Sequence, residues 1–187
     1  MPLDGSLGEA DEEPLYLVCT HGKHDPCCGQ RGRPLVIALS AARPDRVWQA
    51  SHLGGCRFAP TVLTLPLGLM YGRVPPSAAS DLVVATDRGL VVGPFLRGRI
   101  GLAPAVQAAL AFAHEQLALP ACSDVSPLSM QSIDAARVGV RVTSRRGRFE
   151  VTVERRRMTA ADLTCGAPGL SWFLAHRGVA IEPVDSN

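Results

Sequence analysis

Two short segments that carry potential metal ligands constrain the fold more than any other feature of this chain. The first is VCTHGKHDPCCGQRG, with Cys19 and Cys28, and the second is SHLGGCRFAP, with His52 and Cys56. Thiolates and an imidazole are ligands for zinc or for iron in a sulfur cluster. If the four side chains share one metal centre, the fold must bring these two separate loops together.

Each of these segments follows or overlaps a short apolar run. Residues 15–20 (LYLVCT) predict a buried strand that delivers Cys19 at its end, and residues 47–52 (VWQASH) predict a second strand. A loop is expected up to Arg33, and Pro34 then opens a buried helix over PLVIALSAAR. A crossover helix makes the two strands parallel. Cys19 and the end of the second strand would then lie at the same sheet edge, where α/β sheets gather ligands.

The later segments predict a hairpin, two helices and a second hairpin. TVLTLP and LMYGRV, with a turn at Leu67 and Gly68, predict antiparallel strands on the far side of the same sheet. Helices are predicted over SAASDLVVATDR and PAVQAALAFAHEQLA, and both are expected to cover this sheet. RVGVRVTSRRGRFEVTVERRR alternates apolar and polar residues around Arg146-Gly147, which predicts the late hairpin. The order of elements predicts a thioredoxin-like α/β core with a C-terminal β-hairpin extension.

The chain is expected to divide into three parts. Residues 1–14 are polar and acidic and predict a flexible N-terminal tail, residues 15–120 the thioredoxin-like domain, and residues 121–187 a β-rich C-terminal extension. With 187 residues, of which 47 % are apolar, the chain is long and apolar enough to bury a substantial core.

Composition and motifs argue against several kinds of function and partner for this chain. The apolar runs are too short to span a membrane, and a net charge of +2 gives no reason to expect nucleic acid. The chain opens without a secretory signal pattern, so its six cysteines are expected in a reducing cytoplasm. The sequence has no G-x-S-x-G elbow, P-loop or dinucleotide fingerprint, and hydrolase and nucleotide-binding functions are not predicted.

Four segments together resemble the sucrase/ferredoxin-like family. They are VCTHGKHDPCCGQRGRPL, VWQASHLGGCRFAPTVLTLPLGLMYGRV, FLRGRIGLAPAVQAA and VTVERRRMTAADLTCGA, and they extend from about residue 15 to about residue 168. The resemblance implies a thioredoxin-like [2Fe-2S] ferredoxin, with a cysteine pair after the first strand and an H-x-G-G-H motif as ligands. By position it implies Cys19, Cys28 and His52, and it favours Cys28 over the adjacent Cys27.

Position 56 departs from the family pattern, because Cys56 stands where the family usually has its second histidine. The ligand set implied here is therefore three cysteines and one histidine: Cys19, Cys28, His52 and Cys56. A thiolate in place of a neutral imidazole adds negative charge to the cluster. The substitution is expected to lower the reduction potential.

The expected function is single-electron transfer through a [2Fe-2S] cluster. The partner would be a redox protein, either a reductase or an electron acceptor, and a homodimer is one candidate assembly; the chain is not expected to be an enzyme on its own. Two alternatives remain: a structural zinc site in an interaction domain, and a thioredoxin-like thiol oxidoreductase using Cys27 and Cys28 or Cys19. The thiol alternative is disfavoured, because the sequence lacks C-x-x-C and Pro34 is predicted to open the first helix.

Four further residues bear on the site. His21 and His24 lie inside the first loop, either as hydrogen-bonding groups beside the site or as solvent-facing loop residues. Cys122 and Cys165 pair with no other cysteine at a recognisable spacing. Both are placed outside the site, and Cys122 is expected to be structural or incidental.

Charged side chains near the two loops offer contacts with the site or with a partner. Asp25, Arg57 and Arg73 are candidates for charge-assisted hydrogen bonds around it. The arginine runs at residues 145–148 and 155–157 are interpreted as a solvated hairpin face, with electrostatic docking of an acidic redox partner as the alternative.

Overall fold

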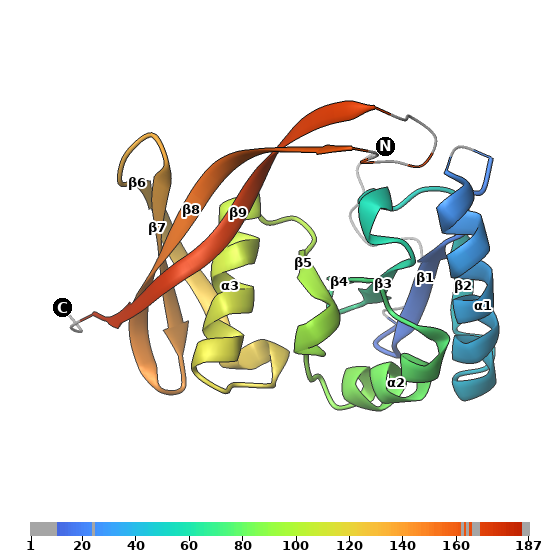
Figure 1. Ribbon diagram of the computed structural model, residues 1–187. Helices are drawn as coiled ribbons and strands as arrows, with labels where there is room; N and C mark the ends of the chain where they lie inside the picture. The colour runs from blue at the N-terminus through green and yellow to red at the C-terminus, as the bar shows by residue number, and fades with distance from the viewer. Residues whose placement is uncertain (1–10, 24, 162, 164, 166–168, 185–187) are drawn as a thin grey trace, which may run out of the picture.

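The computed structural model describes residues 11–23, 25–161, 163, 165 and 169–184, and it contains two sheets (Figure 1). The first is five-stranded with the order β2-β1-β3-β4-β5, and the second is four-stranded with the order β6-β7-β8-β9. The strands of the first sheet are β1 (Leu15–Cys19), β2 (Val47–Ala50), β3 (Thr61–Leu65), β4 (Leu69–Gly72) and β5 (Leu96–Arg99). Those of the second are β6 (Val125–Ser132), β7 (Arg137–Ser144), β8 (Gly147–Ala161) and β9 (Leu170–Pro183). The α-helices are α1 (Pro26–Ala42), α2 (Ala79–Asp87) and α3 (Pro104–Gln116), and short 3-10 turns include η1 (Cys56–Phe58) and η4 (Cys122–Asp124).

The first sheet has the strand order of a thioredoxin-like core. β1 and β2 are parallel, and Cys19 is in register with Ala50, so both strands end at the same edge. β3 runs antiparallel to β1 on its other side, and β4 runs antiparallel to β3. The predicted α/β class is confirmed, as are the parallel strand pair and the hairpin around Leu67 and Gly68.

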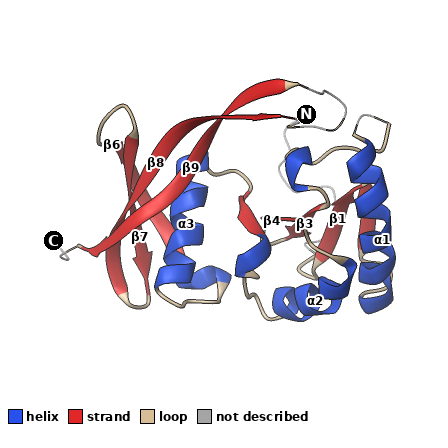
Figure 2. Ribbon diagram, viewed as in Figure 1, coloured by secondary structure: helices blue, strands red, loops and turns tan. Residues whose placement is uncertain are grey.

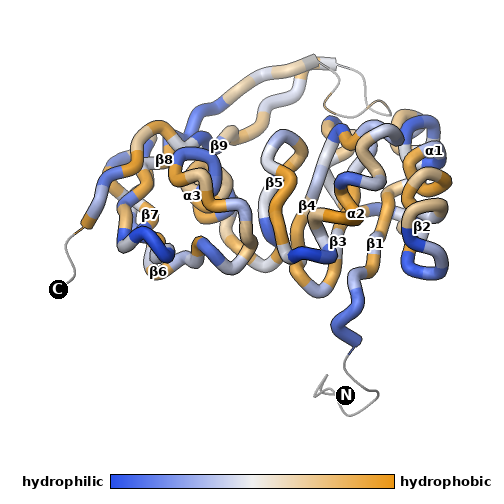
Figure 3. Tube along the Cα trace, turned by 90° about the horizontal axis from the view of Figure 1, so that it is seen from below, coloured by the Kyte–Doolittle hydropathy of each residue, from blue (hydrophilic) through white to orange (hydrophobic). Residues whose placement is uncertain are grey.

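Apolar side chains of α1, α2 and the first sheet form one core. Figure 2 shows these two helices beside the strands of the first sheet. Its fully buried members include Tyr16, Val18, Val62, Tyr71, Leu35, Leu39 and Leu82. Burial of such a side chain contributes about 1.5–3 kcal/mol relative to its exposure to water. Figure 3 shows the change from polar residues just before β1 to apolar residues along it. This core holds the strand ends that carry the predicted ligands.

Helix α1 begins earlier than the sequence pattern indicates. Its first residue is Pro26, and Pro34 lies inside the helix, so the predicted loop up to Arg33 is wrong. Pro26 occupies the first helical position, where a missing N–H is not needed, whereas Pro34 lies in the helix interior and removes one hydrogen bond of the helix. The correction places Cys27 and Cys28 in the first turn of a helix.

Two glycines let α1 approach the end of β1 closely. A Cβ atom on Gly32 would collide with the carbonyl oxygen of Cys19, and one on Gly29 would lie 2.8 Å from the Cα of Gly22. These glycines give the segment a loop-like composition, yet their role is close packing within a helix. They bring the first turn of α1 next to Cys19.

Helix α3 belongs mainly to the second core. The expectation that both later helices cover the first sheet holds for α2, whereas α3 contacts β5 and buries its apolar side against the second sheet. Ala109 and Ala113 pack there with Val140, Val151 and Val153. The C-terminal part is therefore a four-stranded sheet with its own helix, more than the predicted hairpin; the division of domains at residue 120 stays a prediction.

The β8–β9 hairpin reaches from the second sheet towards the N-terminal end of α1 (Figure 1). The turn at Arg146-Gly147 joins β7 to β8, as predicted. The ring centre of Phe173 in β9 lies 4.6 Å from the guanidinium carbon of Arg57, which follows Cys56. The hairpin thus carries late residues to the loops that hold the predicted ligands. In the described part of the chain, no helix combines the length and apolar character needed to cross a membrane.

Candidate metal and thiol site

Three of the four predicted ligands form a buried sulfur group, consisting of Cys19, Cys28 and Cys56. Their exposed fractions are 1 %, 1 % and 6 %. Cys19 ends β1, Cys28 lies in the first turn of α1, and Cys56 begins η1. The sulfur atoms of Cys28 and Cys56 and a carboxylate oxygen of Asp25 lie within 4.8 Å of one another. Three separate elements therefore direct thiols to one place.

His52 lies at the exposed edge of the buried sulfur group. Its Nδ1 atom is 3.9 Å from the sulfur of Cys56. The loop between them contains Gly54 and Gly55, with φ of +80° and +67°. Such angles favour glycine, because a Cβ atom is strained there, and the unusual backbone expected for this pair is observed. The structure thus brings all four predicted ligands into one region.

The buried thiols hold their protons tightly when no cation is present. Burial, followed by the neighbouring Cys19 thiol, raises the pKa of Cys28 far above its usual range. Burial, followed by a hydrogen bond with Asp25, raises the pKa of Cys56 to about 11. A metal cation would favour the thiolates and release these protons. Soft sulfur donors with one imidazole fit either a [2Fe-2S] cluster or zinc.

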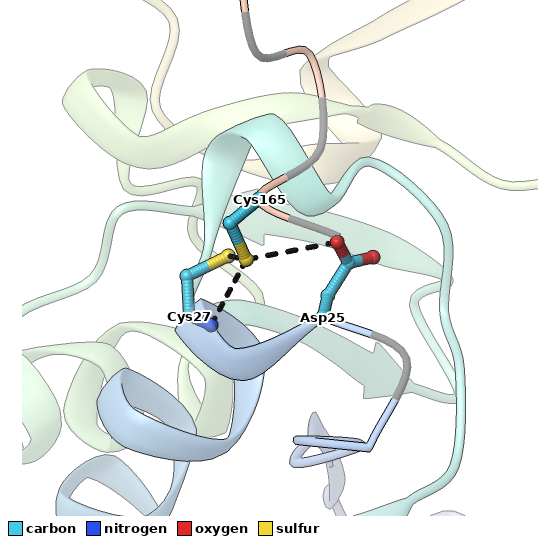
Figure 4. Close-up of side chains that lie close together, drawn as sticks. All are labelled: Asp25, Cys27 and Cys165. Atoms are coloured by element: carbon cyan, nitrogen blue, oxygen red, sulfur yellow. Dashed lines mark hydrogen bonds between the residues drawn. The ribbon is translucent and has the colours of Figure 1, made fainter. Parts of the chain in front are cut away.

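A second sulfur contact joins distant parts of the chain (Figure 4). The sulfur of Cys165 lies 2.7 Å from the sulfur of Cys27, and both cysteines are free. The backbone N–H of Cys27 donates a hydrogen bond to the Cys165 sulfur at 3.1 Å. We call Cys27 and Cys165 the surface thiol pair. The exclusion of Cys165 from the site is therefore wrong, and the 138 residues between the two cysteines explain why no local spacing indicated the contact.

Asp25 lies between the two sulfur groups. It is only 1 % exposed and stands at the N-cap position of α1, where the helix dipole favours a negative charge. On one side a carboxylate oxygen lies within 4.8 Å of the Cys56 sulfur, and on the other its Oδ1 accepts a hydrogen bond from the Cys165 thiol at 3.6 Å. The carboxylate predicted to lie near the site is thus in contact with both groups.

Three further residues named from the sequence are Cys122, His21 and His24. Cys122 is buried in the first core, in keeping with its expected structural role. His21 is partly buried in the loop before α1, and His24 lies outside the described residues.

Three arginines gather around one aromatic ring beside the buried sulfur group. The guanidinium carbons of Arg57, Arg73 and Arg97 lie 4.5, 5.5 and 4.7 Å from the ring centre of Phe58. Within the described residues, none of these arginines forms a salt bridge. Burial lowers the pKa of Arg57 and of Arg97, yet guanidinium groups stay charged in proteins. We call these three residues the arginine cluster.

The arginine cluster borders a cleft of about 1430 Å³ between the two sheets. Arg57 and Arg97 line one side of it, and Arg177 and His176 of β9 line another. Sequence reasoning proposed Arg57 and Arg73 but missed Arg97, which arrives from β5. Its approach to Phe58 depends on the pairing of β4 with β5, and no local motif indicates this pairing.

A thioredoxin-like sheet whose strand ends meet in a sulfur-rich site defines a ferredoxin-like class of protein. The sucrase/ferredoxin-like family matches residues 6–98, and the chain belongs to this family. The matched range includes Cys19, Cys28, His52 and Cys56. It ends before the segment around Cys165, to which the sequence resemblance was expected to extend.

Individual relatives are more distant. Altered inheritance of mitochondria protein 32 from Candida glabrata is 26 % identical over 119 residues, which are 54 % of this chain and 38 % of that protein. A chorismate synthase from Thiobacillus denitrificans is 49 % identical over 41 residues, 22 % of this chain and 11 % of the synthase. The chain thus spans well under two thirds of either relative.

A similar solved structure is a thioredoxin-like [2Fe-2S] ferredoxin from Aquifex aeolicus. It is 22 % identical, with a TM-score of 0.43, and the match covers 50 % of this chain and 97 % of the ferredoxin. The strand order of the first sheet, with β1 between the parallel β2 and the antiparallel β3, is what makes it thioredoxin-like.

Proposed function

We propose that this protein is a one-electron carrier that holds a [2Fe-2S] cluster with Cys19, Cys28, His52 and Cys56. The observation that supports this proposal is the convergence of three buried thiols and one imidazole from separate elements. Membership of the sucrase/ferredoxin-like family favours iron and sulfide over zinc. When bound, such a cluster supplies a site that accepts and returns one electron.

Different residues position the cluster-binding site and connect it with solvent. Cys19 and Cys28 come from a strand end and a helix first turn, which are rigid elements that fix the position of their sulfurs. The N-terminal end of α1 favours negative charge on the nearby thiolates. His52 faces solvent, so electrons would enter and leave on its side of the site.

We further propose that the redox partner is an acidic protein that docks on the arginine cluster. Three guanidinium groups without a salt bridge to a described residue form a positive surface beside Cys56. Opposite charge on a partner would raise the association rate and orient the encounter. The free cysteines suit a reducing compartment, and we propose a cytoplasmic location.

Anaerobic purification followed by analysis of iron, acid-labile sulfide and zinc tests the cofactor directly. Two irons and two sulfides per chain, with visible absorption that bleaches on reduction, are expected for a [2Fe-2S] cluster. A colourless protein with one zinc would overturn the proposal and support a structural zinc site, for which three cysteines and one histidine are also a suitable ligand set.

Cys56 is the ligand to vary, because the family pattern has histidine at this position. Cys56→His should keep the cluster and raise its potential, on the order of 100 mV, since a neutral ligand replaces a thiolate. Cys56→Ala should lose most of the iron. An unchanged potential in Cys56→His would exclude Cys56 as a ligand.

Small redox reagents of opposite charge test the arginine cluster before a partner is known. At low salt we expect an anionic iron–EDTA complex to react faster with the [2Fe-2S] cluster than at high salt, because the arginines attract it. A cationic ruthenium hexaammine complex should react more slowly at low salt, because the arginines repel it. Arg97→Gln should slow the anionic reagent alone. The matched control is Arg88→Gln, an exposed arginine at the end of α2. Equal effects of both variants would contradict docking at the arginine cluster.

A further inference from the structure

We propose that the surface thiol pair, Cys27 and Cys165, is a second redox site that exchanges thiols with a small disulfide substrate. This activity goes beyond electron transfer by a cluster and does not depend on it. The two sulfurs are 2.7 Å apart, whereas a disulfide bond is about 2.05 Å long. A movement of about 0.7 Å would therefore suffice to join them.

The positions of the two cysteines give them different roles. Cys165 is exposed and can meet a substrate, whereas Cys27 is partly buried in the first turn of α1. We assign Cys165 as the attacking thiol and Cys27 as the thiol that resolves the intermediate. The arguments against thiol chemistry from sequence were the lack of C-x-x-C and a helix that opened at Pro34. The structure answers both arguments. The second thiol, Cys165, comes from the segment between β8 and β9 and needs no C-x-x-C spacing, and α1 begins at Pro26, which places Cys27 in its first turn.

The contacts of Cys165 act on its charge in opposite directions. The hydrogen bond with the Cys27 thiol, followed by burial, raises the pKa of Cys165, whereas the backbone amide of Cys27 favours the thiolate. The Cys27 N–H, one of the first-turn amides of α1 that lack a partner within the helix, donates to this sulfur. Asp25 accepts a hydrogen bond from the same thiol. A helix N-terminus favours negative charge on a sulfur placed there.

The reaction balances with a substrate disulfide such as glutathione disulfide. Cys165 attacks one sulfur, the substrate disulfide breaks, and a mixed disulfide forms while the first glutathione leaves as a thiolate and takes up the proton that Cys165 has lost. Cys27 then attacks the Cys165 sulfur, the Cys27–Cys165 bond forms, and the second glutathione leaves with the Cys27 proton. Two electrons pass from the pair, which is oxidised, to glutathione disulfide, which is reduced to two thiols.

The buried sulfur group is kept out of this exchange. Cys19, Cys28 and Cys56 are at most 6 % exposed, so a disulfide substrate has no direct access to them. Accessible thiols exchange, whereas inaccessible ones do not. The chain would thus carry two sulfur sites with different chemistry on either side of Asp25.

The test is to equilibrate the purified full chain in glutathione buffers of increasing disulfide content, quench with acid, alkylate and digest with trypsin. Oxidised samples should contain the peptide HDPCCGQR linked to MTAADLTCGAPGLSWFLAHR, and fragmentation should place the link on Cys27. Dithiothreitol should remove the link. Cys122→Ser, a variant of a buried cysteine outside the pair, should keep it.

Single variants separate the two roles. Cys27→Ser should accumulate glutathione on Cys165, because no thiol resolves the mixed disulfide, whereas Cys165→Ser should acquire little glutathione on Cys27. Absence of the linked peptide under oxidising buffer, or a link from Cys165 to another cysteine, would overturn the proposal. So would loss of iron in Cys165→Ser with unchanged circular dichroism, since Cys165 would then be a ligand. A wild-type chain that lacks iron but forms the link would defeat the electron-carrier proposal alone.

Discussion

The buried sulfur group and the surface thiol pair show how the same side chain acquires different chemistry within one site. Cys19, Cys28 and Cys56 are shielded from solvent, and their shielding favours the protonated thiol until a metal cation replaces the protons. Cys27 and Cys165 touch each other at the surface, where a substrate can reach them. Depth of burial, rather than residue type, separates the thiols proposed as metal ligands from those proposed to exchange.

The largest expected contrast between these groups is in metal content. Loss of a residue that hydrogen-bonds a metal ligand typically lowers metal affinity roughly 10- to 100-fold. Cys28→Ala should lower it further, because it removes a proposed direct ligand. Cys165→Ala should leave metal content unchanged. Metal analysis of both variants after the same anaerobic purification makes the comparison. Equal losses would show that the two groups are one site.

The sequence was most informative where a short pattern decides the structure. The apolar runs gave β1, β2 and the β3–β4 hairpin, because side-chain alternation and turn residues act locally. The placement of Cys19 beside Ala50, two residues before His52, followed from one further step, that parallel neighbours end at the same sheet edge. These steps explain why the four predicted ligands could be brought together before the fold was known.

The start of α1 and the position of Cys165 could not be predicted in the same way. Gly29 and Gly32 lower helix propensity, so their segment looked like a loop, but tertiary packing against Cys19 requires glycine there. The contact of Cys165 with Cys27 depends on how the β8–β9 hairpin reaches α1. Such contacts are set by the whole fold and leave no local spacing.

A smaller effect is expected when α1 is pushed away from β1. Gly32→Ala would place a Cβ atom against the Cys19 carbonyl oxygen, so α1 must shift, and overpacking of this kind costs about 1–3 kcal/mol. The shift should also lower metal content, because Cys28 moves with the helix. Urea unfolding and metal analysis measure both effects.

Gly93→Ala is the matched control for this change. A Cβ atom there meets no described heavy atom within 4 Å, and its stability and metal content should stay close to those of the wild type. Similar behaviour of the two variants would mean that the close approach of α1 is not needed for the buried sulfur group.

Loosening the β8–β9 hairpin should affect the surface thiol pair alone. Phe173→Ala removes the stacking on Arg57, and an exposed cation–π contact contributes about 0.5–1 kcal/mol. At the upper value the fraction of Cys27–Cys165 disulfide at a fixed glutathione ratio should fall about fivefold, since 1.4 kcal/mol is about tenfold. Trp172→Ala is the control, because Trp172 stacks on Arg157 of the same hairpin. A change in metal content in Phe173→Ala would show that the hairpin also affects the buried sulfur group.

The smallest expected effect is a dependence of the hairpin on pH. Burial, followed by the charge of Arg155, which is opposite His176 in the β8–β9 register, lowers the pKa of His176. The unfolded chain, with a histidine pKa of about 6.5, therefore takes up this proton at higher pH than the folded chain does. Stability contributed by neutral His176 is present above that value and is lost as pH falls towards the lowered folded value. Amide exchange of β8 and β9 should speed up between about pH 7 and pH 5.5 in the wild type and much less in His176→Gln. His176 is not one of the proposed metal ligands, so the metal content at pH 7 should be the same in both proteins, and only the Cys27–Cys165 link should weaken with acid.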